Sequence, residues 1–164
     1  MANPIPGFQT GRGSADADLL ILADSPSKND IKAKVCFGGA GSVWFVQELA
    51  NTGHKFHESY AMTALDYYPP SGNVKKLFLN KTDAGRDPKV NFVNGAYVHQ
   101  DVLRNAKRVW QKIDEIKPKF ILALGDLSLW MLTGEKSVDA HRGSMLEIKR
   151  PWGVVRLLPT YHPN

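Results

Sequence analysis

The chain has 164 residues, of which 43% are hydrophobic and 23% are charged, and its net charge is +5. At roughly 100–200 residues per domain, this length predicts one globular domain, and the composition excludes a disordered chain. The single cysteine, Cys36, excludes an internal disulfide framework and an all-cysteine zinc or iron–sulfur site. No apolar run approaches the roughly 20 residues that cross a bilayer, so we expect no membrane partner.

The first half of the chain predicts two strands and one helix. Residues 1–17 form a Gly- and Pro-rich lead-in to a domain that spans 18–164. The apolar run 18–23 is typical of a strand buried on both faces, and turn-forming residues follow at 24–28. Beyond a polar loop, we expect a helix that begins at Ser42 and is stopped by Gly53. A second strand is expected within 59–65, before a loop that contains two prolines.

The second half begins with residues 71–98, where basic residues lie among Gly, Asn, Asp and Pro, and we expect a long irregular loop. Residues 100–117 carry the clearest helical periodicity, which Pro118 ends. Further apolar runs predict strands at 120–124 and 154–158, with a short helix at 126–132 between them.

Strands that alternate with helices predict an α/β fold, a three-layer αβα sandwich around a four-stranded, mainly parallel sheet. In such sheets, ligands bind outside the carboxyl ends of the strands. The segments that follow the four strands are 24–27, 63–70, 125–126 and 160–163. Polar side chains are concentrated in these segments, so we expect the functional site there.

Two residues in these segments could carry chemistry. Asp24 could orient a water molecule or stabilise a developing cation, or it could only cap its own turn. His162, if held neutral, could donate to a developing oxyanion, or it could be a surface histidine. Phe37 precedes a glycine-rich turn and could stack on a flat ring, although a core position explains it equally. Cys36 beside it is expected to be a small buried residue.

Charged residues outside these segments could bind a ligand, but they could also be ordinary surface residues. Lys75, Lys76, Arg142 and Lys149 are expected in loops and could contact phosphates, or they could serve solubility. The group His54, His57 and Glu58 invites a metal interpretation, but its spacing favours a solvated loop.

Taken in order, several segments resemble the uracil-DNA glycosylase superfamily, in particular the branch whose first motif is Gly-Glu-Ala-Pro-Gly. The matching segments are Ala23-Asp-Ser-Pro-Ser27, Phe37-Gly-Gly-Ala-Gly41, Tyr60 to Pro70, Lys117 to Gly125, Arg142-Gly143 and Thr160-Tyr-His-Pro163. Each segment is a weak match, but their order and spacing are fairly specific. The resemblance also extends to the glycosylase-like domains at the start of some bacteriophage DNA polymerases.

The resemblance implies an enzyme that flips uracil out of single- or double-stranded DNA and hydrolyses its N-glycosidic bond. Asp24 would orient water or stabilise the sugar cation, and His162 would donate to the uracil O2 atom. Phe37 would stack on the base, and Ser25 and Thr63 would line the pocket. The basic residues Lys75, Lys76, Arg142 and Lys149 would contact DNA.

The chain also departs from the family. Thr63 replaces the asparagine that reads the base, and Asp24 is one methylene shorter than the family's glutamate. Tyr67 stands where a cluster cysteine is expected, so no iron–sulfur cluster or other cofactor is implied. The family continues beyond the position of Asn164, so we expect a C-terminally truncated domain. It would act in the cytoplasm of a bacterial or phage-infected cell, as a monomer or within a longer replication polypeptide.

These departures leave two alternatives. The domain could bind DNA or uracil without cleavage, as part of a phage replication protein such as a DNA polymerase. It could also be an unrelated α/β domain that binds a small phosphorylated ligand. This last alternative predicts that Asp24, Phe37, Thr63 and His162 lie apart, whereas the glycosylase alternatives need them around one pocket.

Overall fold

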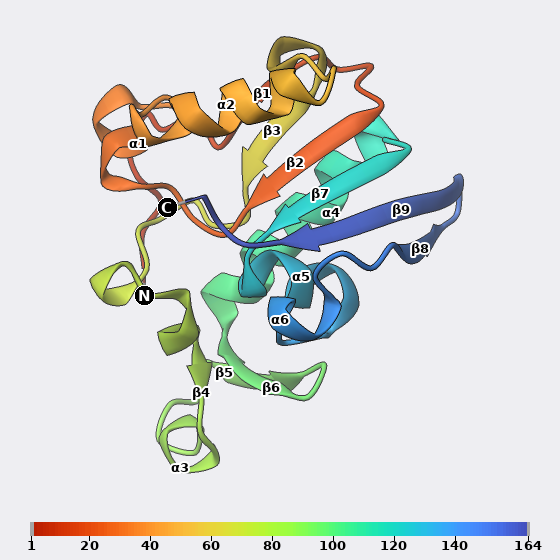
Figure 1. Ribbon diagram of the computed structural model, residues 1–164. Helices are drawn as coiled ribbons and strands as arrows, with labels where there is room; N and C mark the ends of the chain where they lie inside the picture. Colours follow the sequence, from red (N-terminus) through yellow and green to blue (C-terminus); the bar gives the residue numbers. More distant parts are fainter. Residues whose placement is uncertain (1, 164) are drawn as a thin grey trace.

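A mixed sheet forms the centre of the computed structural model, which describes residues 2–163 (Figure 1). Its six strands lie in the order β1-β3-β2-β7-β9-β8. The four central strands are parallel to one another: β3 (Tyr60–Thr63), β2 (Leu19–Ala23), β7 (Phe120–Leu124) and β9 (Gly153–Thr160). The edge strands β1 (Gly11–Gly13) and β8 (Leu146–Arg150) are antiparallel. The α/β class is therefore confirmed, but the expected four strands are corrected to six.

Both edge strands lack the continuous apolar run that marks β2 and β7. β1 has the sequence Gly-Arg-Gly and lies in the segment expected to be a lead-in. β8 alternates apolar and charged residues, which is typical of an antiparallel strand with one solvated face. Its pairing with β9 defines its place at the edge.

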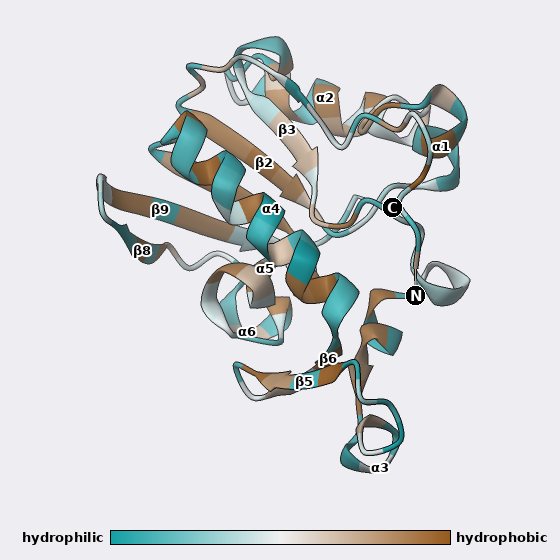
Figure 2. Ribbon diagram, turned by 180° about the vertical axis from the view of Figure 1, so that it is seen from behind, coloured by the Kyte–Doolittle hydropathy of each residue, from teal (hydrophilic) through white to brown (hydrophobic). Residues whose placement is uncertain are grey.

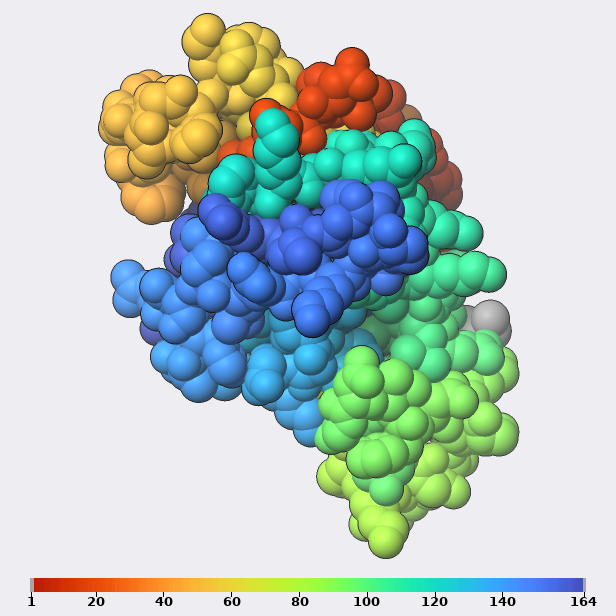
Figure 3. Space-filling view, turned by 90° about the vertical axis from the view of Figure 1, so that its right-hand side faces the viewer, coloured from red at the N-terminus to blue at the C-terminus, as the bar shows by residue number. Residues whose placement is uncertain are grey.

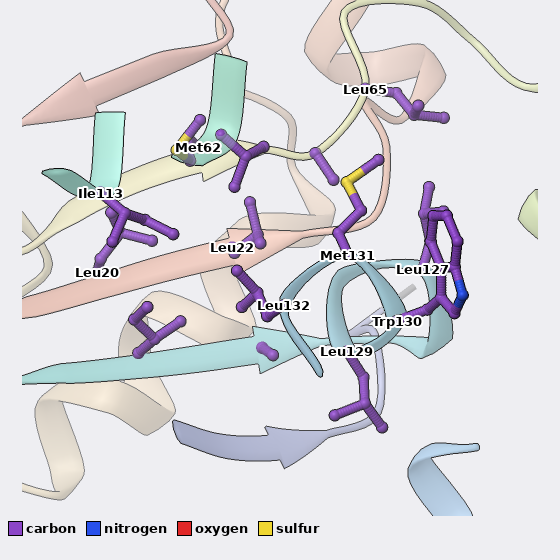
Figure 4. Packing of buried hydrophobic residues seen from close by; sticks show 14 of the residues in the cluster. Leu20, Leu22, Met62, Leu65, Ile113, Leu127, Leu129, Trp130, Met131 and Leu132 are labelled. Atoms are coloured by element: carbon purple, nitrogen blue, oxygen red, sulfur yellow. The ribbon is translucent and has the colours of Figure 1, made fainter. Parts of the chain in front are cut away.

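Successive residues of a strand point to opposite sides of the sheet, and in β2 both sets are apolar. Both faces of the sheet are therefore covered by helices. Ile21 and Ala23 belong to a cluster that includes Phe45 and Leu49 of α2 (Gly41–Asn51). Leu20 and Leu22 belong to a larger cluster that includes residues of α4 (Gln100–Ile116) and α5 (Asp126–Thr133). Figure 4 shows Leu20 and Leu22 in this larger cluster, with Ile113 and Leu127 nearby.

The long helix α4 agrees closely with its prediction. Its apolar face is buried through Val102, Val109 and Ile113, and its outer face is mainly hydrophilic (Figure 2). The helix ends at Lys117, which adopts the left-handed conformation with φ of 54°, and Pro118 follows. The shorter helix α5 likewise matches its expected position, as does α2 apart from a start one residue earlier.

The segment expected to be irregular folds into a second sheet, which corrects the prediction for residues 71–98. Its antiparallel strands lie in the order β4 (Phe78–Leu79), β6 (Ala96–His99) and β5 (Val90–Val93). Strands of two to four residues are too short to show an alternating pattern in the sequence. We call this element the small sheet. It forms a lobe that projects from the body of the molecule (Figures 1 and 3).

Short helices fill the remaining connections. They are α1 (Lys28–Ala33), η1 (Phe56–Glu58), η2 (Pro70–Gly72), η3 (Val74–Leu77), α3 (Lys81–Ala84) and α6 (Val138–His141). Between residues 2 and 163, the structure contains no helix with the length and apolar character needed to cross a membrane.

Candidate functional site

The carboxyl ends of the parallel strands meet at one side of the sheet, and two cavities lie there. The large cavity, of about 410 Å³, is lined by residues 24–28, Tyr68, residues 72–75 and His162. The small cavity, of about 10 Å³, is lined by Ala23, Ser25, Asp30, Phe37, Ser42, Thr63, His162 and Pro163. Ser25 and His162 line both cavities, so the two are adjacent.

Asp24 lies directly after β2 and is 4% exposed. Its Oδ1 atom accepts a hydrogen bond of 2.7 Å from the backbone amide of Ser128, in the first turn of α5. Burial raises the pKa of Asp24 to about 6, although hydrogen bonds from Ser128 and Leu127 act in the opposite direction. Asp24 therefore does not cap its own turn, as one interpretation expected. Its carboxylate instead caps α5, by accepting from a backbone amide that has no partner within the helix.

Gly125 is the residue that lets this contact form. A Cβ atom at this position would lie 2.2 Å from Oδ2 of Asp24, and φ of Gly125 is 112°. Any side chain would therefore displace the carboxylate, and only glycine adopts this backbone conformation without strain. The close approach fixes the carboxylate at the junction of β2, β7 and α5.

His162 follows β9, two strands away from Asp24 in the sheet order. Burial lowers the pKa of His162, so its imidazole is neutral at neutral pH. A neutral imidazole carries one N–H donor, which could stabilise developing negative charge without first releasing a proton.

Phe37 lines the small cavity and also belongs to the core. Its ring lies 5.6 Å from the rings of both Phe45 and Phe56, and it is 7% exposed. Its φ of 53° is unusual for a residue other than glycine, and its carbonyl accepts a hydrogen bond from Arg12. Phe37 is thus a core residue that also lines the small cavity.

Thr63 ends β3 and is 1% exposed. Its hydroxyl donates a hydrogen bond of 2.7 Å to the carbonyl of Leu65, so only its acceptor capacity is left for a ligand. The Thr63 carbonyl accepts from Arg108, whose guanidinium also donates to Ala64 and Thr10. Arg108 of α4 therefore holds the chain in place where it leaves β3.

Asp30 is a site residue that the sequence reasoning missed. It forms a capping box with Ser27 at the start of α1, and its Oδ1 atom accepts from the amide of Gly39. A Cβ atom on Gly39 would lie 2.5 Å from Cβ of Asn29, so this contact requires glycine. The Ser-x-x-Asp spacing at 27–30 is the signal that could have predicted α1 and its cap.

The predicted DNA-contacting residues are divided between different places. Lys75 lies on η3 and lines the large cavity, and Lys76 beside it donates to Ser71. Arg142 follows α6, and its guanidinium lies 4.8 Å from the ring centre of Tyr161.

Lys149 requires a correction, because it lies in β8 and not in a loop. It pairs with Val154 at the start of β9, whereas the site lies beyond Thr160 at the end of that strand. Six residues of strand separate these ends by about 20 Å. Lys149 is therefore far from the two cavities.

The metal interpretation of residues 54–58 gains no support. The side chains of His57 and Glu58 are 78% and 61% exposed, and the distance between His57 Nε2 and Glu58 Oε1 is 3.9 Å. Throughout residues 2–163, the structure contains no group of three His, Cys, Asp or Glu side chains arranged to hold a metal ion. Cys36 is fully buried as expected, and burial raises the pKa of its thiol to about 12.

Comparisons with known proteins give one informative similarity. The chain is 25% identical over 162 residues to a protein named DNA polymerase from Bacillus phage SP01. The match covers 99% of this chain but only 15% of the phage protein, so the chain corresponds to a small part of that relative. A comparison with models of protein families finds no match.

Proposed function

We propose that this chain is a base-excision domain of the uracil-DNA glycosylase type, which accepts a base flipped out of DNA and hydrolyses its N-glycosidic bond. One observation carries the proposal: Asp24 and His162, from the ends of different strands, line the same cavity of about 410 Å³. The arrangement suits a reaction that develops positive charge on the sugar and negative charge on the base.

The two side chains would act on opposite ends of the breaking bond. The buried Asp24 carboxylate would stabilise the sugar cation and orient the attacking water, because charge interactions are stronger in a site that excludes solvent. The neutral His162 would donate to the oxygen of the departing base. Lys28 and Lys75, both exposed at the large cavity, would contact the phosphates of the flipped nucleotide.

Two observations favour a second candidate function, in which the domain binds DNA without cleavage. The small cavity has room for about one water molecule, so a base can enter only if its walls move. The Thr63 hydroxyl is already engaged with Leu65. The relative's name, DNA polymerase, also fits a module that brings a replication protein to its template.

The proposal is tested by incubating the full chain with a single-stranded oligonucleotide that contains one uracil, and by measuring released uracil. A known uracil-DNA glycosylase serves as the positive control. We expect release by the wild-type chain, loss of release in Asp24→Asn, and a loss of about 10²–10³-fold in His162→Gln. His57→Gln, which changes an exposed histidine away from the cavities, should be unaffected.

The same samples separate the two candidates. Tighter binding of the uracil oligonucleotide than of its thymine counterpart, without release, would favour the binding module. If the chain neither releases uracil nor distinguishes the two oligonucleotides, both candidates are wrong.

A further inference from the structure

The small sheet has one face packed on the body, and its other face is partly exposed to solvent. Ala96 and Val98 of β6 are buried in the larger core cluster, so Tyr97, which lies between them in the strand, points away from the body. Phe92 of β5 lies directly opposite Tyr97 in the antiparallel register. It therefore shares the outer face of the sheet.

This outer face carries an aromatic pair, of which Phe92 is the solvent-exposed member. Phe92 is 63% exposed, and its ring centre lies 4.7 Å from that of Tyr97. Leu79 of β4 is opposite Tyr97 on its other side, so the three side chains form a row across the sheet. An exposed aromatic ring that is held in place by a neighbouring ring has a free face on which another planar group can stack.

The chain around this row also carries a net positive charge. Residues 75–99 contain five Lys or Arg and two Asp, so this segment holds three of the five net positive charges of the whole chain. Exposed rings among basic residues are the combination by which proteins hold single strands, with bases on the rings and phosphates near the cations. A duplex would not suit the row, since its bases are already stacked on one another.

The row is connected to the candidate site through the chain. Val74 and Lys75 of η3 line the large cavity, and β4 begins directly after η3 at Phe78. Leu79, Lys76 and His99 line a further cavity of about 290 Å³ between the two regions. Figure 1 shows the small sheet extending from the same part of the molecule as η3.

We propose that the outer face of the small sheet binds single-stranded DNA, with bases stacked on Phe92 and Tyr97 and phosphates neutralised by the basic residues of segment 75–99. The inference extends the proposed function by assigning a contact for the strand next to the flipped nucleotide. It requires no uracil and no cleavage, so it can be tested separately.

The test measures binding of a fluorescently labelled 15-nucleotide oligothymidylate to the full chain by anisotropy. Base stacking on an aromatic residue is worth about 1–3 kcal/mol, so Phe92→Ala should weaken binding roughly 5- to 150-fold. Phe92→Trp should retain binding and Phe92→Leu should not, because stacking needs a ring and not only an apolar side chain. Binding should also weaken with added salt.

Phe120→Ala is the matched control, because Phe120 is also an exposed phenylalanine (40%) but lies at the amino end of β7. It should bind as the wild type does. Equal binding by Phe92→Ala and wild type, or equal binding by Phe92→Leu and Phe92→Trp, would overturn the proposal. Tighter binding of oligouridylate RNA, or of duplex DNA, would overturn it in favour of another ligand.

The outcome is distinguishable from that of the proposed function. Asp24→Asn should bind oligothymidylate as the wild type does, even where it releases no uracil. Phe92→Ala should leave the large cavity intact. At a saturating concentration of the uracil oligonucleotide, this variant should therefore still release uracil.

Discussion

The carboxylate of Asp24 accepts a hydrogen bond from the backbone amide of Ser128 at 2.7 Å, which joins the end of β2 to the first turn of α5. The contact stabilises the helix, because it satisfies an amide that has no partner within the helix. It also holds a charge in a buried place, which costs free energy. The rise in the pKa of Asp24 to about 6 shows that the cost of burial exceeds the gain from the hydrogen bonds.

Asp24→Asn should therefore make the protein more stable at neutral pH. The ordinary pKa of an aspartate is 3.8, and the pKa of Asp24 in the folded protein is about 6. Folding therefore favours the protonated carboxyl. The contribution of this group is most favourable below pH 4 and is lost as the pH rises through about 6. The stability difference between Asp24→Asn and wild type should grow by roughly 2–3 kcal/mol between pH 4 and pH 7.5.

Urea unfolding at several pH values measures this difference, with Asp16→Asn, an exposed carboxylate, as the control. If the difference in unfolding free energy between Asp24→Asn and wild type does not depend on pH, then ionised Asp24 does not destabilise the folded protein. Combined with a loss of uracil release, greater stability would mark Asp24 as a residue kept for activity at the expense of stability.

The cleavage rate should follow the ionisation of Asp24. Since the proposed role needs the carboxylate, kcat/KM should fall about tenfold per pH unit below pH 6 and level off above pH 7. Burial lowers the pKa of His162, so its neutral form predominates near neutral pH and adds no second loss there. A pH–rate profile of uracil release checks this, and a profile that falls between pH 6 and pH 8 would contradict it.

The sequence was most informative where segments are long or continuously apolar. The helix at 100–117 and the strands at 18–23 and 120–124 were predicted within a few residues, because burial on one stripe or on both faces leaves a pattern in composition. The position of the site followed from the same pattern, since polar residues directly after parallel strands meet at one edge.

The missed elements depend on contacts between distant segments. β1 contains two glycines and is a strand only because it pairs with β3, and the small sheet is built from strands of two to four residues. The partner of Asp24 could not be predicted either, because Ser128 is 104 positions away in the chain. Lys149 was misplaced for a different reason, since β8 is a short edge strand whose only strand partner is the adjacent β9, and residues 146–150 contain no continuous apolar run.

Gly125→Ala should disrupt the junction of β2 and α5. The new Cβ atom would lie 2.2 Å from Oδ2 of Asp24, and the φ of 112° is strained for alanine. We expect a loss of at least about 3 kcal/mol in the free energy of unfolding. Gly53→Ala, with φ of 88° and no atom within 4 Å of the new Cβ, should lose only about 1 kcal/mol.

A double-mutant cycle separates the two causes of this loss. If the clash with the carboxylate dominates, Asp24→Ala combined with Gly125→Ala should be less destabilised than the sum of the single variants. Additive effects would instead assign the loss to backbone strain at Gly125.

Arg108→Met should destabilise the end of β3, because it removes hydrogen bonds to four residues at one time. The guanidinium donates to the carbonyls of Thr63 and Ala64 at 2.7 and 2.8 Å and to the hydroxyl of Thr10 at 3.0 Å, and it also contacts Asn105. Leaving buried carbonyls without a donor should cost about 2–4 kcal/mol in unfolding free energy. Arg108→Lys should recover only part of this, since an ammonium cannot reproduce the planar arrangement of donors.

Arg104→Ala is the matched control on the same helix. Its side chain is 46% exposed and pairs with Asp66, so its removal should cost less than about 1 kcal/mol. Because Arg108 fixes the carbonyl of Thr63, Arg108→Lys should also raise KM for the uracil oligonucleotide, whereas Arg104→Ala should not. Equal effects of the two substitutions on stability and on KM would show that the half-buried Arg108 neither supports β3 nor positions Thr63 at the small cavity.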